Sequence, residues 1–197
     1  WDPDAWMGGA GKDTGASAAG DSTAGQGRGD GPRPWGLFVP LYALRSERDW
    51  GAGDLADLEE LCGQVSDGRR GGGGSGGGTV VATLPLLAAY LDRPFEPSPY
   101  RPVSRLFWNE LYLAVERIPE YGMCGTAREI RGSTETRERL TRLRAAPLVD
   151  YQEVAALKRR VVEELSRCFF EKAGDKRRHR FTDFLQAHSE IGGYAAF

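Results

Sequence analysis

The sequence contains few of the residues that build metal centres or disulfide frameworks. Its 197 residues include three cysteines and two histidines, with no CxxC motif and no paired Cys/His spacing. An odd number of widely separated cysteines argues against a complete disulfide framework, and a reducing cytoplasm is their simplest setting. We therefore predict a cytoplasmic protein without a metal or cofactor, in which Cys62, Cys124 and Cys168 serve as small buried hydrophobic residues.

The sequence also lacks a long apolar run and an excess of charge of one sign. No stretch approaches the roughly 18 apolar residues that a membrane-spanning helix needs, and no signal-peptide pattern is visible. The formal net charge is −2, and charges of both signs are interspersed rather than gathered into a basic patch or an acidic tail. We therefore predict neither a membrane nor a nucleic acid as a partner. No pattern indicates an oligomeric state.

Apolar residues are scarce at the start of the chain. Residues 1–34 are rich in Gly, Ala, Ser, Asp and Thr. They cannot bury enough apolar surface to offset the entropy of ordering, so we predict a disordered segment followed by a folded part over residues 35–197. The chain does not begin with Met and ends in an apolar YAAF. Both features suggest a piece of a longer protein.

The folded part is predicted to open with a strand, a helix and a second strand. Residues 35–41 form a short apolar run after a Pro/Gly boundary, and residues 79–87 (TVVATLPLL) form a second run without alternation. Such runs are typical of strands buried on both faces. Between them, Asp54 is a good N-cap for a helix that continues to about residue 66. This βαβ unit should have a right-handed crossover.

A glycine-rich stretch at residues 71–78 (GGGGSGGG) precedes the second strand. It lacks the Lys-Ser/Thr of a phosphate-binding P-loop. It also precedes a strand, whereas the glycine-rich fingerprint of a nucleotide-binding fold follows one. We interpret it as a linker between helix and strand.

The segment after the second strand is unusually rich in proline and aromatic residues. We call residues 84–112 the proline loop; it holds prolines at 94, 97, 99 and 102 and six aromatic residues. Each proline fixes its own φ and favours extended geometry before it, so the loop should be stiff and non-helical. Loops that follow buried strands carry binding sites in open α/β sheets and barrels. A loop whose aromatics merely cap the core is an equally good interpretation of composition alone.

The second half of the chain is predicted to be mainly helical. Residues 111–118 (LYLAVERI) show some alternation and favour a short strand or an extended segment, and residues 128–144 favour one or two solvent-facing helices. From Tyr151 an apolar stripe recurs at helical spacing, and Lys158 is interpreted as lying off that stripe. The stripe consists of Val154, Leu157, Val161, Leu165, Cys168 and Phe169.

Several stretches, in the same order, resemble one enzyme family. The Ser-Pro-Tyr at residues 98–100 and the residues after it look like the Ser-Pro-Tyr loop of the 4-α-glucanotransferases, also called amylomaltases, of glycoside hydrolase family 77. The resemblance extends over about residues 35–197. Its other motifs are residues 36–46 (GLFVPLYALRS), 49–55 (DWGAGDL), 148–151 (LVDY) and 194–197 (YAAF).

The resemblance implies a fold and a function. The fold class is α/β: the opening segment of a (β/α)8 TIM barrel, about two strands, with a helical subdomain inserted at about residues 119–197. The activity is transfer of α-1,4-glucan segments between maltooligosaccharides by a retaining double displacement, and the partner is therefore an α-1,4-glucan. Neither a cofactor nor a metal is implied.

The resemblance also implies which residues bind substrate. Tyr100 matches the family's tyrosine whose ring packs on the glucose beside the cleavage point, and Ser98 lies in the same motif. Asn109 matches an asparagine of the family, although Glu110 stands where the family has proline. Asp49 and Trp50 match a motif assigned to a loop beside the site. For Ser98, a turn-forming serine before proline is at least as good an interpretation.

No pair of carboxylates suited to catalysis is apparent. Retaining glycosyl transfer needs two carboxyl groups about 5 Å apart, and no Asp or Glu pair here has a sequence reason to be that close. The family's catalytic carboxylates lie on later barrel strands, so we predict that this chain alone holds no catalytic residue and is inactive. The alternatives are a non-catalytic glucan-binding or interaction module, and a truncated product without a stable fold.

Overall fold

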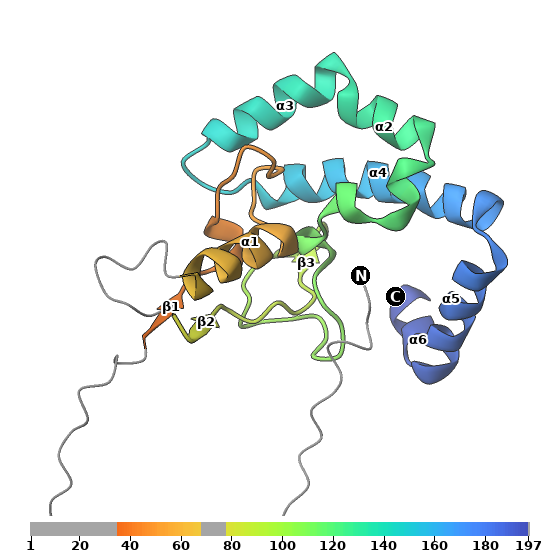
Figure 1. Cartoon of the computed structure of the whole chain (residues 1–197), viewed down its shortest axis with the longest axis horizontal. Coiled ribbons are helices and arrows are strands. Elements are labelled where there is room, and N and C mark those ends of the chain that lie inside the picture. The colour runs from red at the N-terminus through yellow and green to blue at the C-terminus, as the bar shows by residue number, and fades with distance from the viewer. Residues whose placement is uncertain (1–34, 68–77, 197) are drawn as a thin grey trace, which may run out of the picture.

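The computed structural model describes residues 35–67 and 78–196. They form a mixed α/β structure in which short strands and loops lie beside a larger helical part (Figure 1). The segment predicted to be disordered, residues 1–34, lies outside the described residues, as do Phe197 and nearly all of the glycine-rich linker.

The predicted βαβ unit is confirmed. β1 (Gly36–Phe38) pairs in parallel with β2 (Val80–Ala82), and Gly36 lies opposite Val80 in the register. The helix α1 (Leu55–Ser66) lies between them in sequence. Gly36 allows the two strands to approach closely, because a Cβ there would lie 2.8 Å from the carbonyl oxygen of Val80. The handedness of the crossover stays a prediction.

The prediction that both strands are buried on both faces is wrong for this chain. Phe38 is 61% exposed and Val80 is 57% exposed. Among the described residues this sheet has only two strands, so no further strand covers its edges. The first strand is also shorter than predicted, because the backbone turns into a 3-10 helix, η2 (Leu41–Ala43), where the apolar run still continues. Leu41 itself is fully buried.

The helix α1 begins as predicted. Its N-cap Asp54 accepts hydrogen bonds from the backbone N–H groups of Ala56 and Asp57, at 2.9 and 3.2 Å. The Asp57 carboxylate in turn accepts from the N–H of Asp54 at 2.8 Å, which completes a capping box. These bonds satisfy N–H groups that have no partner within the helix, and so they fix its first turn.

The proline loop is non-helical until its last residues, as predicted. Its early part contains a small antiparallel hairpin of β3 (Tyr90–Leu91) and β4 (Phe95–Glu96), with a cis peptide bond before Pro94. The hairpin was not expected, since neither strand is longer than two residues.

The strand or extended segment predicted at residues 111–118 is wrong. The chain forms the 3-10 helices η3 (Glu110–Tyr112), η4 (Val115–Arg117) and η5 (Pro119–Gly122). The Asn109 side chain starts η3 by accepting a hydrogen bond from the Leu111 N–H at 3.0 Å. This local cap outweighs the weak alternation in hydrophobicity, because asparagine side chains compete readily for nearby backbone donors.

The remaining helices lie in the half of the chain that was predicted to be mainly helical. The charged segment forms two helices, α2 (Gly125–Gly132) and α3 (Thr134–Ala145). Next come α4 (Tyr151–Lys172), α5 (Asp175–Ala187) and the short α6 (Ile191–Ala196). In Figure 1, α2 and α3 lie along one side of α4, and the proline loop (yellow-green) extends on the opposite side. None of the helices in the described ranges is long and apolar enough to cross a membrane.

The hydrophobic core lies where α4 meets α2, α3, the 3-10 helices and the loop before α1. The apolar stripe of α4 is buried from Val154 to Cys168. Lys158, however, is 2% exposed, so the prediction that it lies off the stripe is wrong. Its position between Val154 and Val161 places it on the buried face by helical spacing. Its charge, rather than its position, suggested exposure.

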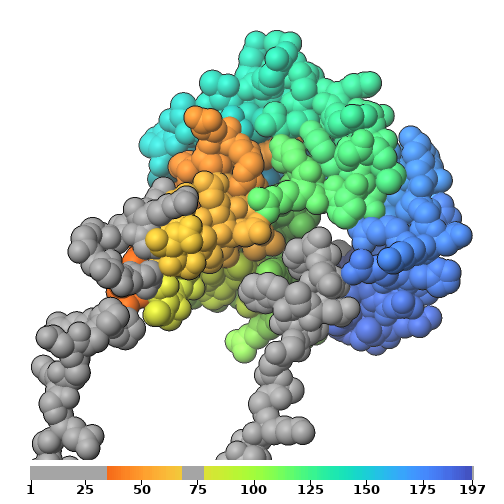
Figure 2. All heavy atoms as spheres, viewed as in Figure 1, coloured from red at the N-terminus to blue at the C-terminus, as the bar shows by residue number. Residues whose placement is uncertain are grey.

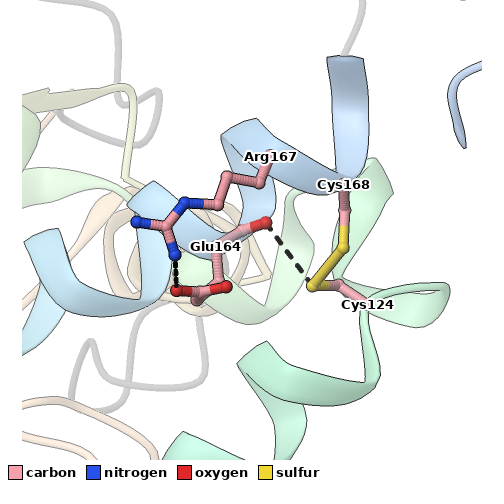
Figure 3. The surroundings of a disulfide bond; sticks show 4 residues. All are labelled: Cys124, Glu164, Arg167 and Cys168. Carbon is pink, nitrogen blue, oxygen red and sulfur yellow. Dashed lines mark hydrogen bonds and ion pairs between the residues drawn. A yellow bond between two sulfur atoms is a disulfide. The ribbon is translucent and has the colours of Figure 1, made fainter. Parts of the chain in front are cut away.

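Two of the cysteines do not serve as separate hydrophobic residues. Cys124, at the N-cap of α2, forms a disulfide with Cys168 on α4, and both are buried (Figure 3). The sulfur of Cys124 also lies 3.5 Å from the carbonyl oxygen of Glu164. Cys62 is free and exposed, so the prediction of a buried residue there is wrong as well. Sequence spacing gives no sign of this pairing, because the two cysteines are 44 residues apart.

Candidate substrate-binding site

The proline loop is held at its base by backbone hydrogen bonds between its two arms. The Asn109 N–H donates to the carbonyl of Leu86 at 2.8 Å, and the Ala88 N–H donates to the carbonyl of Phe107 at 2.9 Å. Val103 returns to the same place, because its N–H donates to the carbonyl of Ala88 at 2.8 Å. The loop therefore closes on itself, and its middle part projects beyond the base.

Tyr100 lies in this projecting part, in a tight turn. The Ser98 hydroxyl accepts from the Tyr100 N–H at 3.4 Å, and the Ser98 carbonyl accepts from the Arg101 N–H at 3.1 Å. Glu96 supports the turn by accepting from the Ser98 N–H at 3.3 Å and by pairing with Arg101 at 3.0 Å. The backbone of the turn is fixed locally, while the Tyr100 side chain is left outside.

Tyr100 is 72% exposed, which is unusual for a large aromatic residue in a well-bonded turn. Three other large apolar side chains of the loop are also exposed: Phe95, Leu106 and Trp108. Figure 2 shows the loop (yellow-green) protruding at the lower edge of the molecule. Exposed rings on a stiff loop offer an apolar surface for a flat ligand, and a pyranose ring has such a face in its C–H groups.

Asn109 has a different position from Tyr100 and Ser98. It is 7% exposed, and its side-chain oxygen is occupied by the N–H of Leu111. It therefore joins the end of the proline loop to η3. Its position supports a role in holding the loop rather than in contacting a ligand directly.

Asp49 and Trp50 are fully buried. The Asp49 carboxylate accepts from the N–H groups of Ser46 and Gly51, at 2.8 and 2.7 Å. Its backbone carbonyl accepts from Nε of Arg144 at 2.7 Å. Asp49 therefore shapes the turn at residues 46–51 and ties it to α3. No part of its side chain is presented to a ligand in this structure.

Trp50 links the same turn to the helical part through an ionic cluster. Its indole N–H donates to Glu116 at 3.1 Å, and Glu116 pairs with Arg131 of α2 at 2.8 Å. The guanidinium of Arg131 lies 5.3 Å from the centroid of the indole ring, within cation–π range. Trp50 is thus bonded at its edge and covered on its face.

Gly51 makes the close packing of this turn possible. Its φ is +97°, a conformation that other residues rarely adopt. A Cβ at this position would lie 2.7 Å from the Cβ of Leu143 on α3. The turn that carries Asp49 and Trp50 therefore requires glycine both for its backbone and for its contact with α3.

Asp54 and Asp57 share a cationic partner near this turn. Arg48 donates to Asp54 at 3.2 Å and also pairs with Asp57. Burial raises the pKa of Asp54 above its usual value, and the positive charge of Lys158 opposes that rise. Both carboxylates are occupied by the capping box of α1, so this pair serves structure rather than catalysis.

Lys158 is the main residue that sequence reasoning missed. Its ammonium group donates to the carbonyl oxygens of Leu111 and Leu113, at 2.6 and 2.8 Å. Burial lowers the pKa of Lys158 to about 8, against the attraction of Asp54 and other nearby carboxylates. The only sequence signal was helical position, because a lysine with core residues at i−4 (Val154) and i+3 (Val161) faces inward.

The candidate site therefore combines a presented loop with buried supports. Tyr100 and Ser98 lie together in the projecting turn, whereas Asn109, Asp49 and Trp50 lie in the supporting structure. Arg48, Glu116, Arg131 and Lys158 complete the support and were not singled out from the sequence. Among the residues that the structure describes, no group of His, Cys, Asp or Glu side chains is arranged to hold a metal ion.

Comparison with known proteins gives a consistent result. The model of glycoside hydrolase family 77, described as 4-alpha-glucanotransferase, matches residues 39–197. A 4-alpha-glucanotransferase of Haemophilus influenzae is 32% identical over 160 residues, which are 79% of this chain and 22% of the relative. A 4-alpha-glucanotransferase of Mycobacterium tuberculosis is 48% identical over 90 residues, which are 46% of this chain and 12% of the relative. The chain thus spans about a fifth or less of these relatives' lengths.

Proposed function

The chain belongs to glycoside hydrolase family 77, the 4-alpha-glucanotransferases, and on that premise we propose that it is the N-terminal part of such an enzyme. The proposed activity of the whole enzyme is transfer of α-1,4-glucan segments between maltooligosaccharides. The small share of each curated relative that the chain covers supports the assignment to a part.

The proposed fold of the whole enzyme is a (β/α)8 barrel that begins with β1, α1 and β2. The parallel pairing of the two strands supports this proposal, because parallel strands joined by a helix are the repeating unit of such a barrel. The exposure of Phe38 and Val80 is consistent with further strands and helices covering this sheet in the longer protein. The helical part, residues 119–197, would then be an insertion after the second strand.

The proposed contribution of this chain is part of the sugar-binding wall. The observation that carries the proposal is the 72% exposed ring of Tyr100 on a turn held by several local hydrogen bonds. In this proposal the Tyr100 ring packs on the apolar face of a glucose unit, and the Ser98 hydroxyl forms a hydrogen bond with a sugar hydroxyl. Ser98 accepts from Tyr100 N–H, and its own proton is suited to donation.

The other three candidate residues act through the loops in this proposal. Asn109 holds the end of the proline loop, and Asp49 with Trp50 holds the neighbouring turn against α2 and α3. Preorganised loops reduce the entropy that ligand binding must overcome. The catalytic steps are assigned to carboxylates outside this chain, as a nucleophile and an acid/base in a retaining double displacement.

Binding measurements on this chain test the proposal directly. Maltoheptaose is titrated into the chain, and Tyr100→Ala is compared with Tyr90→Ala, a nearby aromatic in the hairpin. An aromatic contact of this kind is worth about 1–3 kcal/mol, so Tyr100→Ala should weaken binding roughly ten- to a hundredfold. Tyr100→Phe should bind almost as well as the unaltered chain, because the ring face is retained.

The control variant separates binding from stability. If the proline loop only covers the core, the two alanine variants lose affinity equally and both lower the melting temperature. Under our proposal, Tyr100→Ala loses affinity while its melting temperature stays unchanged. Full binding by Tyr100→Ala would contradict the assignment of this loop as a sugar-binding wall.

A further inference from the structure

The last helix of the described chain contacts the proline loop. The ring of Tyr194 on α6 stacks on the ring of Phe107, with a centroid distance of 4.2 Å and an angle of 24° between the planes. Phe107 lies near the middle of the folded part and Tyr194 near its end, so the contact depends on how α5 and α6 return toward the loop. In Figure 1, α6 lies on the side of α4 that faces the loop.

The electrostatic surroundings of Tyr194 agree with this contact. Burial raises the pKa of the Tyr194 hydroxyl, and the charge of Glu110 adds to the rise. Glu110 follows Asn109, at the point where the loop enters η3. Tyr194 therefore faces the returning arm of the loop through its ring at Phe107, and the charge of Glu110 on the same arm acts on its hydroxyl.

Phe107 is well placed to transmit this contact to the rest of the loop. Its carbonyl accepts from the Ala88 N–H at 2.9 Å, and the Ala88 carbonyl accepts from the Val103 N–H at 2.8 Å. Its neighbour Trp108 forms an antiparallel bridge with Leu87. If Phe107 moves, the bonds that join the two arms move with it.

We propose that Tyr194 is a positioning residue that holds the proline loop in its closed arrangement through Phe107. The inference that Tyr194 orders the loop rests on geometry alone. Its consequence for glucan binding rests on the proposed function, because it requires that Tyr100 contacts sugar. When only a fraction of molecules has the loop in place, the apparent affinity is reduced to that fraction of its full value. Tyr194 then tunes affinity without touching the ligand.

Hydrogen–deuterium exchange on the whole chain tests the loop order. The backbone N–H groups of Ala88, Val103 and Asn109 report on the base of the loop, because each is hydrogen-bonded there. In Tyr194→Ala we expect their exchange to rise by about two- to tenfold, as expected when one aromatic contact is lost from a locally opening segment. Tyr194→Phe retains the stacked ring and should exchange like the unaltered chain.

Phe184→Ala is the matched control, because Phe184 is an aromatic residue of the neighbouring helix α5 that contacts His188. It should leave exchange at the three loop positions unchanged. Unchanged loop exchange in Tyr194→Ala would overturn the proposal. So would an equal rise in α4 and in the loop, since that would indicate general loss of stability.

Maltoheptaose titration of the same variants separates this inference from the proposed function. We expect Tyr194→Ala to lower the apparent affinity in proportion to the fraction of molecules that keep the loop in place, and Tyr194→Phe to restore it. If the unaltered chain does not bind maltoheptaose, the proposed function fails while the exchange result still decides the role of Tyr194. If loop exchange rises but affinity does not fall, Tyr194 orders the loop, and the proposed effect of Tyr194 on glucan affinity is overturned.

Discussion

The ammonium group of Lys158 lies 2.6 Å from the carbonyl oxygen of Leu111. Lys158 is on the central helix α4, and Leu111 lies at the end of the proline loop, within η3. A second bond to the Leu113 carbonyl at 2.8 Å fixes the same turn. Unpaired buried carbonyls are costly, so the lysine serves as their donor and joins the loop to the core of the helical part.

The stability that depends on Lys158 should increase with pH above about 8. Burial lowers its pKa to about 8 in the folded protein, whereas an unfolded lysine titrates near 10.5. Below pH 8 both states bind the proton, and the full penalty for the buried charge is present. Between pH 8 and 10.5 the folded state releases the proton and the unfolded state keeps it, so the free energy of unfolding rises with pH.

Denaturant unfolding of the unaltered chain and Lys158→Met between pH 7 and 10.5 measures this effect. The difference in free energy of unfolding should change by up to about 3 kcal/mol in favour of the unaltered chain. Lys172→Met, at the exposed end of α4, is the control and should show no such change. A Lys158 difference that stays constant over this range would contradict the lowered pKa.

Trp50→Phe should destabilise the chain substantially. The substitution leaves a cavity at a fully buried position and removes the indole N–H that donates a hydrogen bond to Glu116. We expect a loss of about 2 kcal/mol in the free energy of unfolding, from lost packing and from the lost indole hydrogen bond, although Glu116 keeps its ion pair with Arg131. Trp108→Phe, at a half-exposed position, should cost much less. Equal losses at both sites would mean that the indole bond to Glu116 contributes little.

Removal of the disulfide should lower stability without changing the arrangement of the helices. The bridge between Cys124 and Cys168 closes a segment with a separation of 44 residues. Loop-closure entropy predicts that its loss costs about 4 kcal/mol, through the greater freedom of the unfolded chain. The measurement compares the double variant Cys124→Ala/Cys168→Ala with the unaltered chain under oxidising conditions.

Two controls accompany the disulfide prediction. Cys62→Ser removes the exposed free thiol and should leave stability unchanged. A reductant should destabilise the unaltered chain toward the level of the double variant and should leave the double variant unaffected. A double variant as stable as the oxidised chain would show that the bridge has no stabilising role.

The chain alone should not disproportionate maltotriose. Asp54 and Asp57, the carboxylates that share Arg48, are engaged in capping α1 rather than presented at the proline loop. We expect no enzyme-dependent glucose or longer oligomers above a blank, as measured by chromatography of the products. Clear product formation that is lost in Tyr100→Ala would place catalytic groups within this chain and would contradict the proposed division of roles.

Much of the local structure could be predicted from the sequence. The cap at Asp54, the parallel strands on either side of α1, the non-helical proline loop and the apolar stripe of α4 were all predicted correctly. The cap, the loop and the stripe depend on residues close together in the chain: a side chain that caps its own helix, prolines that fix their own φ, and apolar residues that recur at one period. The parallel pairing joins distant residues and was predicted from the order strand, helix, strand. The family motif singled out Tyr100 from a short contiguous pattern, and its role in binding stays a prediction.

Other features were decided only by tertiary structure. The sequence could not show that Lys158 is buried or that Cys124 meets Cys168, because each depends on a partner brought near by packing. The stack of Tyr194 on Phe107 is of the same kind. Asp49 and Trp50 match a family motif for a loop beside the site. In the structure they are buried and hold their turn against α2 and α3. Periodicity and motifs report local preference, whereas the roles of these side chains were set by contacts between distant segments.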